Sequence, residues 1–222
     1  MSNLSHESLL REIDEDLRRE RYGELWRRFG IYIVAAIVAL LVGVAGYQFW
    51  QYRIRSAHQD ASARLLSATA LVETDRAAAE GELAALAGDG PAGLAVLAGL
   101  RQAALLAESG DVLAARAAYQ QVQRTAGNPL YRDLAVVREA MLALQAEAVP
   151  LDAGAIAAKL EPLKAEANPW RFSAQELSAL LASRTGQIAD ARALLNGLVA
   201  NQQVPPDMRE RAQQLLTQLP ES

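Results

Sequence analysis

Hydrophobic residues are concentrated in one long run near the start of the chain, and residues 29–49 contain no charged side chain. A helix over residues 29–50 would measure about 33 Å, enough to cross a hydrocarbon core of about 30 Å. Aromatic residues gather at both ends of this run, as they do at the two interfaces of a bilayer. They are Trp26, Phe29 and Tyr32 at one end and Tyr47, Phe49, Trp50 and Tyr52 at the other. The pattern predicts a transmembrane helix over residues 29–50.

Two other interpretations of the apolar run fit less well. A signal peptide has a short basic start and a cleavage site of small residues. Residues 1–28 are instead long and mixed in charge, and the run is followed by aromatic and basic residues. A buried core helix would not explain why aromatic residues mark both ends.

The charged residues that flank the run predict its orientation. Cytoplasmic flanks carry the excess of Lys and Arg. Arginine is more frequent before the run (Arg18, Arg19, Arg21, Arg27, Arg28) than after it (Arg53, Arg55, Arg64). We therefore expect residues 1–28 to be a cytoplasmic charged segment and residues 51–222 to lie on the other side. Leu10, Ile13 and Leu17 form a narrow apolar stripe in residues 1–28, which fits either a short solvated helix or a docking site for a cytoplasmic partner.

One face of the predicted span carries small residues. Ala35, Ala39, Gly43 and Gly46 recur at helical spacing. Small residues on one face allow a second helix to approach closely. The alternative is that the stripe only reflects a chain that uses alanine heavily throughout. The sequence thus predicts a helix–helix seam at these four positions.

Beyond residue 51 the pattern is that of helices interrupted by short stops, with no stretch that alternates like a strand. Pro91, Pro129, Pro169 and Pro205 are separated by 38, 40 and 36 residues. Proline ends one helix and is tolerated in the first turn of the next. A period of this length indicates stacked helix pairs. The expected fold is all-α: one transmembrane helix followed by an α-solenoid of degenerate helix pairs over residues 51–222.

Two of the predicted pairs have a readable turn. Gly110 and Gly186 are each expected to end the first helix of a pair, and the next residue, Asp111 or Gln187, can cap the second helix. The same two pairs share further positions. Ala115 and Ala191 follow the turn glycines by five residues and are expected where the helices cross, and Tyr119 and Leu195 are expected to fill the space towards the next pair.

These positions match a tetratricopeptide repeat. The match is incomplete, because Gly99 and Gln175 stand where a large aromatic is expected early in the first helix. The middle unit, about residues 130–167, has no turn glycine. Repeat arrays of this kind are interaction modules without chemistry of their own.

Composition excludes several functional classes. The net charge is −4, from 22 basic and 26 acidic residues, which gives no concentrated basic surface for nucleic acid. There is no cysteine and there are two histidines, so disulfides, zinc clusters and the usual nucleophile–base pairs are not available. The acidic cluster Glu73, Asp75, Glu80 and Glu82 is expected to be a solvated face rather than a metal site. We expect no enzyme activity, no cofactor and no small-molecule substrate.

Three segments resemble one known family. They are residues 12–19 with 25–30, which combine acidic and basic residues with Trp and Gly at membrane entry, then Asn168-Pro169-Trp170-Arg171, and residues 205–212. In this order around one span they resemble the ancillary SecYEG translocon subunit family, single-span tetratricopeptide-like proteins of Gram-negative inner membranes. The Ala-rich repeats and short turns are similar to an alphaproteobacterial branch.

The resemblance implies a role in protein export. It places the chain in the inner membrane with a periplasmic repeat domain, beside translocon subunits and a membrane-anchored periplasmic chaperone, where it assists extended secretory client proteins. It brings no catalytic residues. A periplasmic adaptor for envelope assembly or cell division is the alternative function, and an enzyme is the least favoured class.

The repeat register also predicts where a partner would bind. The first helices of the pairs line the concave face of such a solenoid. The predicted concave surface comprises Leu97, Leu100, Ala104, Leu142, Glu176, Leu180 and Arg184. It is mostly apolar, which favours weak contact with extended apolar segments; the alternative is that its leucines are buried within the domain. Trp170 is expected to pack in the core at a repeat junction rather than to anchor a partner.

Overall fold

The computed structural model describes residues 3–146 and 150–220, with side chains described from Arg27 onward. Within these ranges the chain is helical and contains no strand, which confirms the predicted fold class. The elements are α1 (Asn3–Leu71), α2 (Arg76–Asp89), α3 (Ala92–Glu108), α4 (Val112–Thr125), α5 (Pro129–Gln145), α6 (Ala153–Leu160), the 3-10 helix η1 (Glu161–Lys164), α7 (Arg171–Arg184), α8 (Ile188–Ala200) and α9 (Pro206–Gln218).

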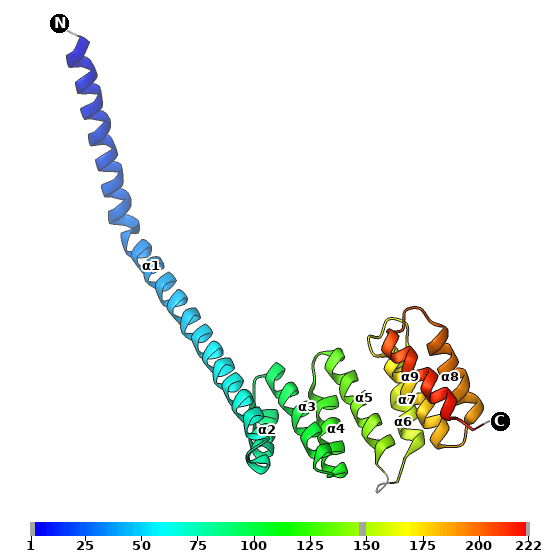
Figure 1. Cartoon of the computed structure of the whole chain (residues 1–222). Helices are drawn as coiled ribbons and strands as arrows, with labels where there is room; N and C mark the ends of the chain where they lie inside the picture. Colours follow the sequence, from blue (N-terminus) through cyan, green and yellow to red (C-terminus); the bar gives the residue numbers. More distant parts are fainter. Residues whose placement is uncertain (1–2, 147–149, 221–222) are drawn as a thin grey trace. The chain divides into compact units, whose positions relative to one another are not determined.

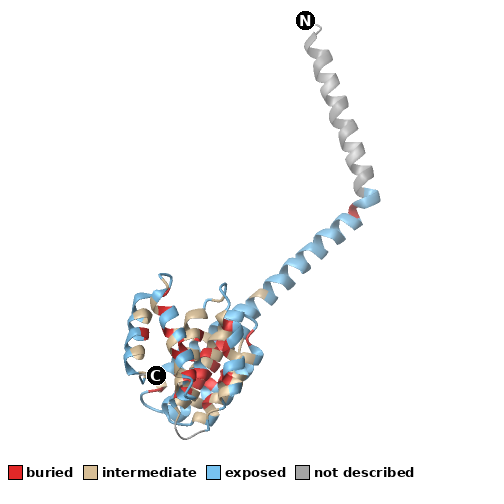
Figure 2. Ribbon diagram, turned by 90° about the vertical axis from the view of Figure 1, so that its right-hand side faces the viewer, coloured by how far each residue is buried: buried red, intermediate tan, exposed pale blue. Residues whose placement is uncertain are grey.

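The chain divides into two compact units, residues 1–57 and 58–222. The described part of the first unit is helix α1 from Asn3 to Ala57, and its apolar stretch is exposed along its length (Figure 2). In the described part of the chain, α1 is the one helix long and apolar enough to cross a membrane. The backbone of residues 3–26 belongs to α1, but the side chains of the predicted stripe at Leu10, Ile13 and Leu17 lie outside the described residues.

Helix α1 runs on without interruption well past the end of the predicted span. No proline occurs before Pro91, so no residue in this stretch removes a backbone donor from the helix. In the second unit the end of α1 packs against α2 through Ala61 and Ala68, which are buried with Leu83 and with Val72 in the turn that follows α1. This end of α1 therefore serves as the first helix of a pair that precedes Pro91. The boundaries at residues 28 and 50 stay a prediction.

The remaining helices stack as pairs in chain order (Figure 1). All four periodic prolines mark the start of the first helix of a pair or of the final helix, as predicted. Pro91 precedes α3, Pro129 opens α5, Pro169 lies just before α7, and Pro205 precedes α9. Each proline sits where a helix has no internal partner for its backbone N–H.

The two predicted turns form as expected, with one exception. Gly110 and Gly186 have φ values of 82° and 77°, in the left-handed region that glycine adopts without strain. The Asp111 carboxylate accepts a hydrogen bond from the Ala114 backbone N–H at 3.0 Å and so caps α4. The prediction for Gln187 is wrong, because its side chain makes no cap bond to α8. Glutamine is not among the residues favoured at this position.

The small and large positions after each turn pack as predicted. Ala115 and Ala191 are fully buried. Tyr119 packs with Ala135 of α5, in the following pair. Leu195 likewise packs with residues of α9. These two pairs therefore each close their core with a large side chain directed at the next element.

Gly99 is buried in α3, where the tetratricopeptide pattern expects an aromatic side chain. A Cβ atom at this position would lie 2.8 Å from Cγ2 of Val122 and 3.7 Å from Cβ of Ala87. The Val122 side chain of α4 therefore lies too close to α3 for a larger residue at position 99 without rearrangement, whereas Ala87 of α2 is at an ordinary contact distance. The close approach of Val122 explains the departure from the pattern.

The middle pair is irregular, since α6 has only eight residues and is followed by η1. It is held by Glu139 of α5, which is 4% exposed. Its carboxylate accepts hydrogen bonds from Arg116 at 3.2 Å and Gln120 at 2.7 Å in α4, from Gln123 at 2.8 Å, and from Lys159 of α6 at 2.5 Å. One buried carboxylate thus links α4 to α5 and α6, the two helices of the pair that lacks the regular turn.

Candidate functional site

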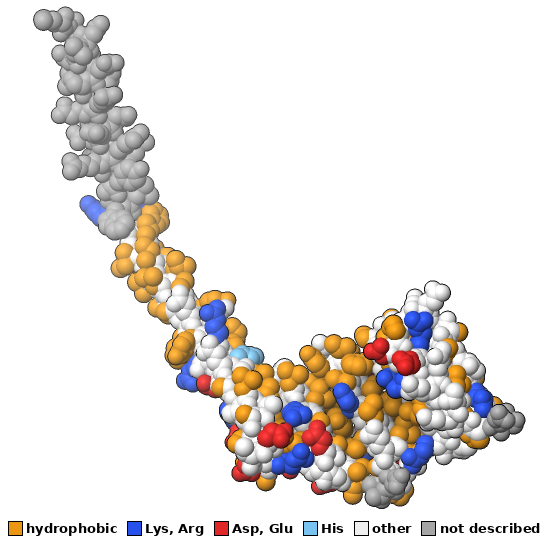
Figure 3. Space-filling view, viewed as in Figure 1, with side chains coloured by type: hydrophobic (Ala, Val, Ile, Leu, Met, Phe, Trp, Pro, Cys, Tyr) orange, Lys and Arg blue, Asp and Glu red, His pale blue; other side chains and the backbone are white. Residues whose placement is uncertain are grey.

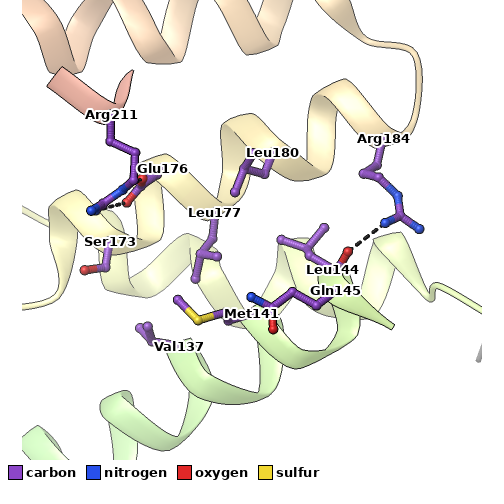
Figure 4. Close-up of a pocket in the computed structure, with 10 residues that line it drawn as sticks. All are labelled: Val137, Met141, Leu144, Gln145, Ser173, Glu176, Leu177, Leu180, Arg184 and Arg211. Carbon is purple, nitrogen blue, oxygen red and sulfur yellow. Dashed lines mark hydrogen bonds and ion pairs between the residues drawn. The ribbon is translucent and has the colours of Figure 1, made fainter. Parts of the chain in front are cut away.

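The repeat domain has a hollow of about 560 Å³ bounded by α5, α7 and α9. Figure 3 shows hydrophobic side chains gathered over α5 and the helices beside it. The hollow is lined by Val137, Met141, Leu144, Gln145, Ser173, Glu176, Leu177, Leu180, Arg184 and Arg211. Its walls are mainly aliphatic, with polar groups at the two ends (Figure 4).

Helix α5 contributes three apolar side chains to the hollow. Val137, Met141 and Leu144 recur at i, i+4 and i+7, so they lie on one face of the helix. Val137 and Leu144 are also part of the core cluster beneath, whereas Met141 is 37% exposed at the rim. Leu177 and Leu180 face them from α7 (Figure 4). Core packing therefore holds Val137 and Leu144 in place at the bottom of the hollow, while the flexible side chain of Met141 lies at its rim.

One end of the hollow is closed by an ion pair between α7 and α9. Glu176 is buried and receives two hydrogen bonds from the Arg211 guanidinium, including Nη2 to Oε2 at 2.9 Å. The hydrogen bond to Glu176 raises the pKa of Arg211, although partial burial opposes this. The pair holds the final helix against the last repeat and leaves a neutral polar edge at this end.

The other end carries Arg184, the last residue of α7. Its Nη1 donates a hydrogen bond of 2.6 Å to the backbone carbonyl of Leu144. That carbonyl lies in the last turn of α5, where helix carbonyls have no internal partner. Arg184 therefore caps α5 and joins two successive first helices of the solenoid.

The structure brings together part of the predicted concave surface. Glu176, Leu180 and Arg184 all line the hollow. The three predicted residues of α3 do not line it: Leu97 is 40% exposed, Leu100 packs against the core of its own pair, α3 and α4, and Ala104 is half-buried.

Leu142 lies on a different face of α5 from the hollow. It packs against the cluster that contains Val96 and Tyr119. The neighbouring Met141 takes the position in the hollow, because one residue turns a helical side chain by about 100°. The i, i+4, i+7 spacing of Val137, Met141 and Leu144 is the sequence signal that would have identified the correct face. Arg211 had no such signal, since it is 35 residues from Glu176 in the sequence.

Three of the four predicted seam residues share a shallow groove on α1. Ala35, Ala39 and Gly43 line it together with the larger Ile31, Val34, Val38 and Val42. Gly46 does not line this groove, and no atom lies within 4 Å of a Cβ built at Gly43 or Gly46. The face is open to close approach by another helix, and its use as a seam stays a prediction.

The acidic cluster is engaged in ordinary structural contacts. Asp75 caps α2 by accepting from Ala78 N–H at 3.0 Å, Glu80 accepts from the Ser109 hydroxyl at 3.2 Å, and Glu82 pairs with Arg64 at 3.1 Å. Across the residues that the structure describes, no group of three His, Cys, Asp or Glu side chains is arranged to hold a metal ion. The chemistry that the hollow offers is apolar contact with polar groups at its ends.

Comparison with known proteins gives one match. The family model of the tetratricopeptide repeat-like domain matches residues 24–217, which include most of α1 and the whole stack of pairs. No curated protein and no solved structure matches the chain.

Proposed function

Because the chain belongs to the tetratricopeptide repeat-like domain family, we propose that it is a membrane-anchored interaction protein that assists protein export. Domains of this type act as scaffolds for other proteins and carry no chemistry of their own. The proposal rests on the hollow between α5, α7 and α9, because its mainly apolar walls could hold an apolar segment of another protein.

The anchor in this proposal is the apolar part of α1. Residues 29–50 span the bilayer, residues 1–28 are cytoplasmic, and residues 51–222 form the periplasmic repeat domain. Support comes from the exposure of the large apolar side chains between Ile31 and Trp50, which water would disfavour. The small-residue face at Gly43 is the contact for a partner helix in the same membrane.

The occupant of the hollow is an extended apolar segment of a client protein. Helix α7 runs for about 16 Å between Ser173 and Arg184, at 1.5 Å per residue. An extended chain covers that length with about five residues, at roughly 3.3 Å each. An exposed methionine at the rim adapts to side chains of different shape, which suits clients without a common sequence.

The export role rests on the resemblance of residues 12–19 with 25–30, Asn168–Arg171 and 205–212 to the ancillary SecYEG translocon subunit family. In that role the partners are translocon subunits and a membrane-anchored periplasmic chaperone, and the clients are secretory proteins that have not yet folded. Purification of the tagged full chain from mild detergent should recover translocon subunits. Recovery of division or envelope-assembly proteins without them would replace export by the adaptor function.

A second experiment tests the hollow itself. Met141→Asp places a charge at its rim, where the side chain is 37% exposed, so the fold should survive. Crosslinking of the full chain to an unfolded secretory protein should fall by about tenfold, as expected from about 1.4 kcal/mol of lost contact. Leu113→Asp is the matched control, since Leu113 is 65% exposed on α4 and does not line the hollow. If both variants crosslink as well as the parent, clients do not bind in the hollow.

A further inference from the structure

The segment that follows the apolar run of α1 combines aromatic and basic side chains in a fixed arrangement. The Arg53 guanidinium carbon lies 5.5 Å from the centroid of the Phe49 ring, within the range of a cation–π contact. On another face, the Arg55 Nη2 donates to Gln51 Oε1 at 2.6 Å, and Gln51 Nε2 donates to the Tyr47 hydroxyl at 2.7 Å. Both arginines are exposed. We call Tyr47, Phe49, Gln51, Arg53 and Arg55 the collar.

The collar carries positive charge that its own helix does not balance. No Asp or Glu occurs between Glu24 and Asp60. Asp60 lies five residues after Arg55, roughly 140° around the helix, and so does not face it. Asp60 shares a face with Arg53 but lies about 10 Å further along the helix, beyond the three- or four-residue spacing at which helical side chains pair. Arg53 and Arg55 themselves are separated by about 200°, which places them on opposite sides of α1. The two guanidinium groups are therefore directed at two different neighbours.

The depth of the collar matches that of lipid phosphates. Arg53 and Arg55 lie about 4.5 and 7.5 Å along the helix past Trp50, at 1.5 Å per residue. The headgroup layer adds roughly 5–7 Å to each side of the hydrocarbon core. Aromatic rings at the end of the span and guanidinium groups just beyond it thus fall at the level where phosphate oxygens are found.

We propose that the collar binds the phosphate headgroups of anionic phospholipids, one on each side of α1. This inference rests on the proposed insertion of α1 in a membrane, and it goes beyond the role of the repeat domain. The guanidinium fork matches two phosphate oxygens, and the Phe49 and Gln51 contacts orient it before lipid arrives. Each arginine should enrich anionic over zwitterionic lipid beside the helix by roughly fivefold.

The test uses Trp50, which lies beside the collar, as a fluorescent reporter in the full chain. Trp26→Phe and Trp170→Phe remove the other two tryptophans. The protein is reconstituted in phosphatidylcholine vesicles that contain a minor fraction of phosphatidylglycerol. Brominated acyl chains, which quench tryptophan on contact, are carried either by the phosphatidylglycerol or by the same amount of phosphatidylcholine.

Brominated phosphatidylglycerol should quench Trp50 more strongly than brominated phosphatidylcholine, and high salt should reduce the difference. Arg53→Gln with Arg55→Gln should abolish it. Arg27→Gln with Arg28→Gln, which removes the same charge at the other end of the span, should leave it unchanged. Equal quenching by the two lipids in the parent would contradict the proposed binding of anionic lipid by the collar, but it would still be consistent with insertion of α1 in the membrane. Absence of quenching by either lipid would show that α1 is not inserted, and would contradict both the membrane anchor and the lipid site.

Discussion

At the scale of single residues, Glu139 is the side chain on which the middle pair depends. Burial raises the pKa of Glu139, but hydrogen bonds from Gln123, Lys159 and Gln120 lower it more, and the pKa ends below its ordinary value of 4.5. A carboxyl group with a lowered pKa in the folded state stabilises the protein at pH values above its unfolded pKa. This stabilisation is lost as the pH falls from about 4.5 through the pKa of the folded state.

Glu139→Gln should therefore lower stability at neutral pH by about 2–3 kcal/mol, because it removes charge-assisted hydrogen bonds to Arg116 and Lys159, which remain partly solvated. The difference from the parent should shrink in acid, where Glu139 is itself protonated. Thermal unfolding of the full chain in detergent, followed by circular dichroism, measures both effects. Glu161→Gln is the control, because Glu161 is 72% exposed and should contribute less than about 1 kcal/mol. A loss that is the same at neutral and acid pH would assign the effect to packing.

Substitution of Trp170 distinguishes its two possible roles, core packing at a repeat junction and anchoring of a partner. It packs against the core cluster of the middle and last pairs, as predicted, and its Nε1–H donates to the Leu130 carbonyl at 2.9 Å. Trp170→Ala should cost about 3 kcal/mol, near the low end for a large aromatic because the side chain is half-buried. Trp170→Phe should cost about 1 kcal/mol, mainly from the lost hydrogen bond. An unchanged melting temperature with reduced partner binding would instead identify Trp170 as an anchor.

At the scale of helices, glycine has opposite effects at two positions. Gly99→Ala in α3 should destabilise by about 1–2 kcal/mol, since overpacking against Val122 exceeds the gain in helix propensity. Gly81→Ala in α2 should stabilise by up to about 1 kcal/mol, because no atom lies within 4 Å of the added Cβ. Val122→Ala should remove most of the penalty at Gly99 in a double-mutant cycle. Additive effects of the two substitutions would show that α3 and α4 relax freely.

The apolar face of α1 gives a second prediction at this scale. Gly43→Leu fills the groove that Ala35 and Ala39 help to line, and should reduce recovery of a membrane partner without loss of membrane insertion. Val44→Leu is the matched control, because it changes a neighbouring residue that does not line the groove. Recovery that is unchanged for Gly43→Leu would leave the small residues without a role in association.

The sequence predicted the helices best where one residue type has one physical effect. Periodic prolines located the starts of α3, α5, α7 and α9, and Gly110 and Gly186 located two turns, since each fixes the backbone locally. The extension of α1 into the first pair was not predicted, because the predicted helix ended with its apolar run at residue 50. No helix-breaking residue lies between that point and Leu71, where α1 ends. On α5 the sequence indicated Leu142, whereas Met141 lines the hollow, because the middle pair has no turn glycine to set its register.

At the scale of the whole molecule, the family match and the apolar helix follow from long patterns, and the hollow does not. The hollow depends on contacts between residues far apart in the sequence, such as Arg211 with Glu176 and Arg184 with Leu144. A repeat period indicates that helix pairs stack, but it does not specify these contacts between distant residues. That is why Glu176, Leu180 and Arg184 were predicted on a common surface, while Met141 and Arg211 were not.

The orientation of the chain in its membrane is the prediction on which the export role depends. More arginines precede the apolar run than follow it, and cytoplasmic flanks retain basic residues during insertion. A reporter that is active only outside the cytoplasm should therefore give a signal when fused after Ser222 and none when fused before Met1. Replacing Arg18, Arg19, Arg21, Arg27 and Arg28 by glutamine should produce a mixed population, since Arg53, Arg55 and Arg64 then form the larger basic flank. A cytoplasmic signal from the parent at Ser222 would place the hollow on the side where secretory proteins have not yet crossed, and the proposed contact with translocated clients would fall with it.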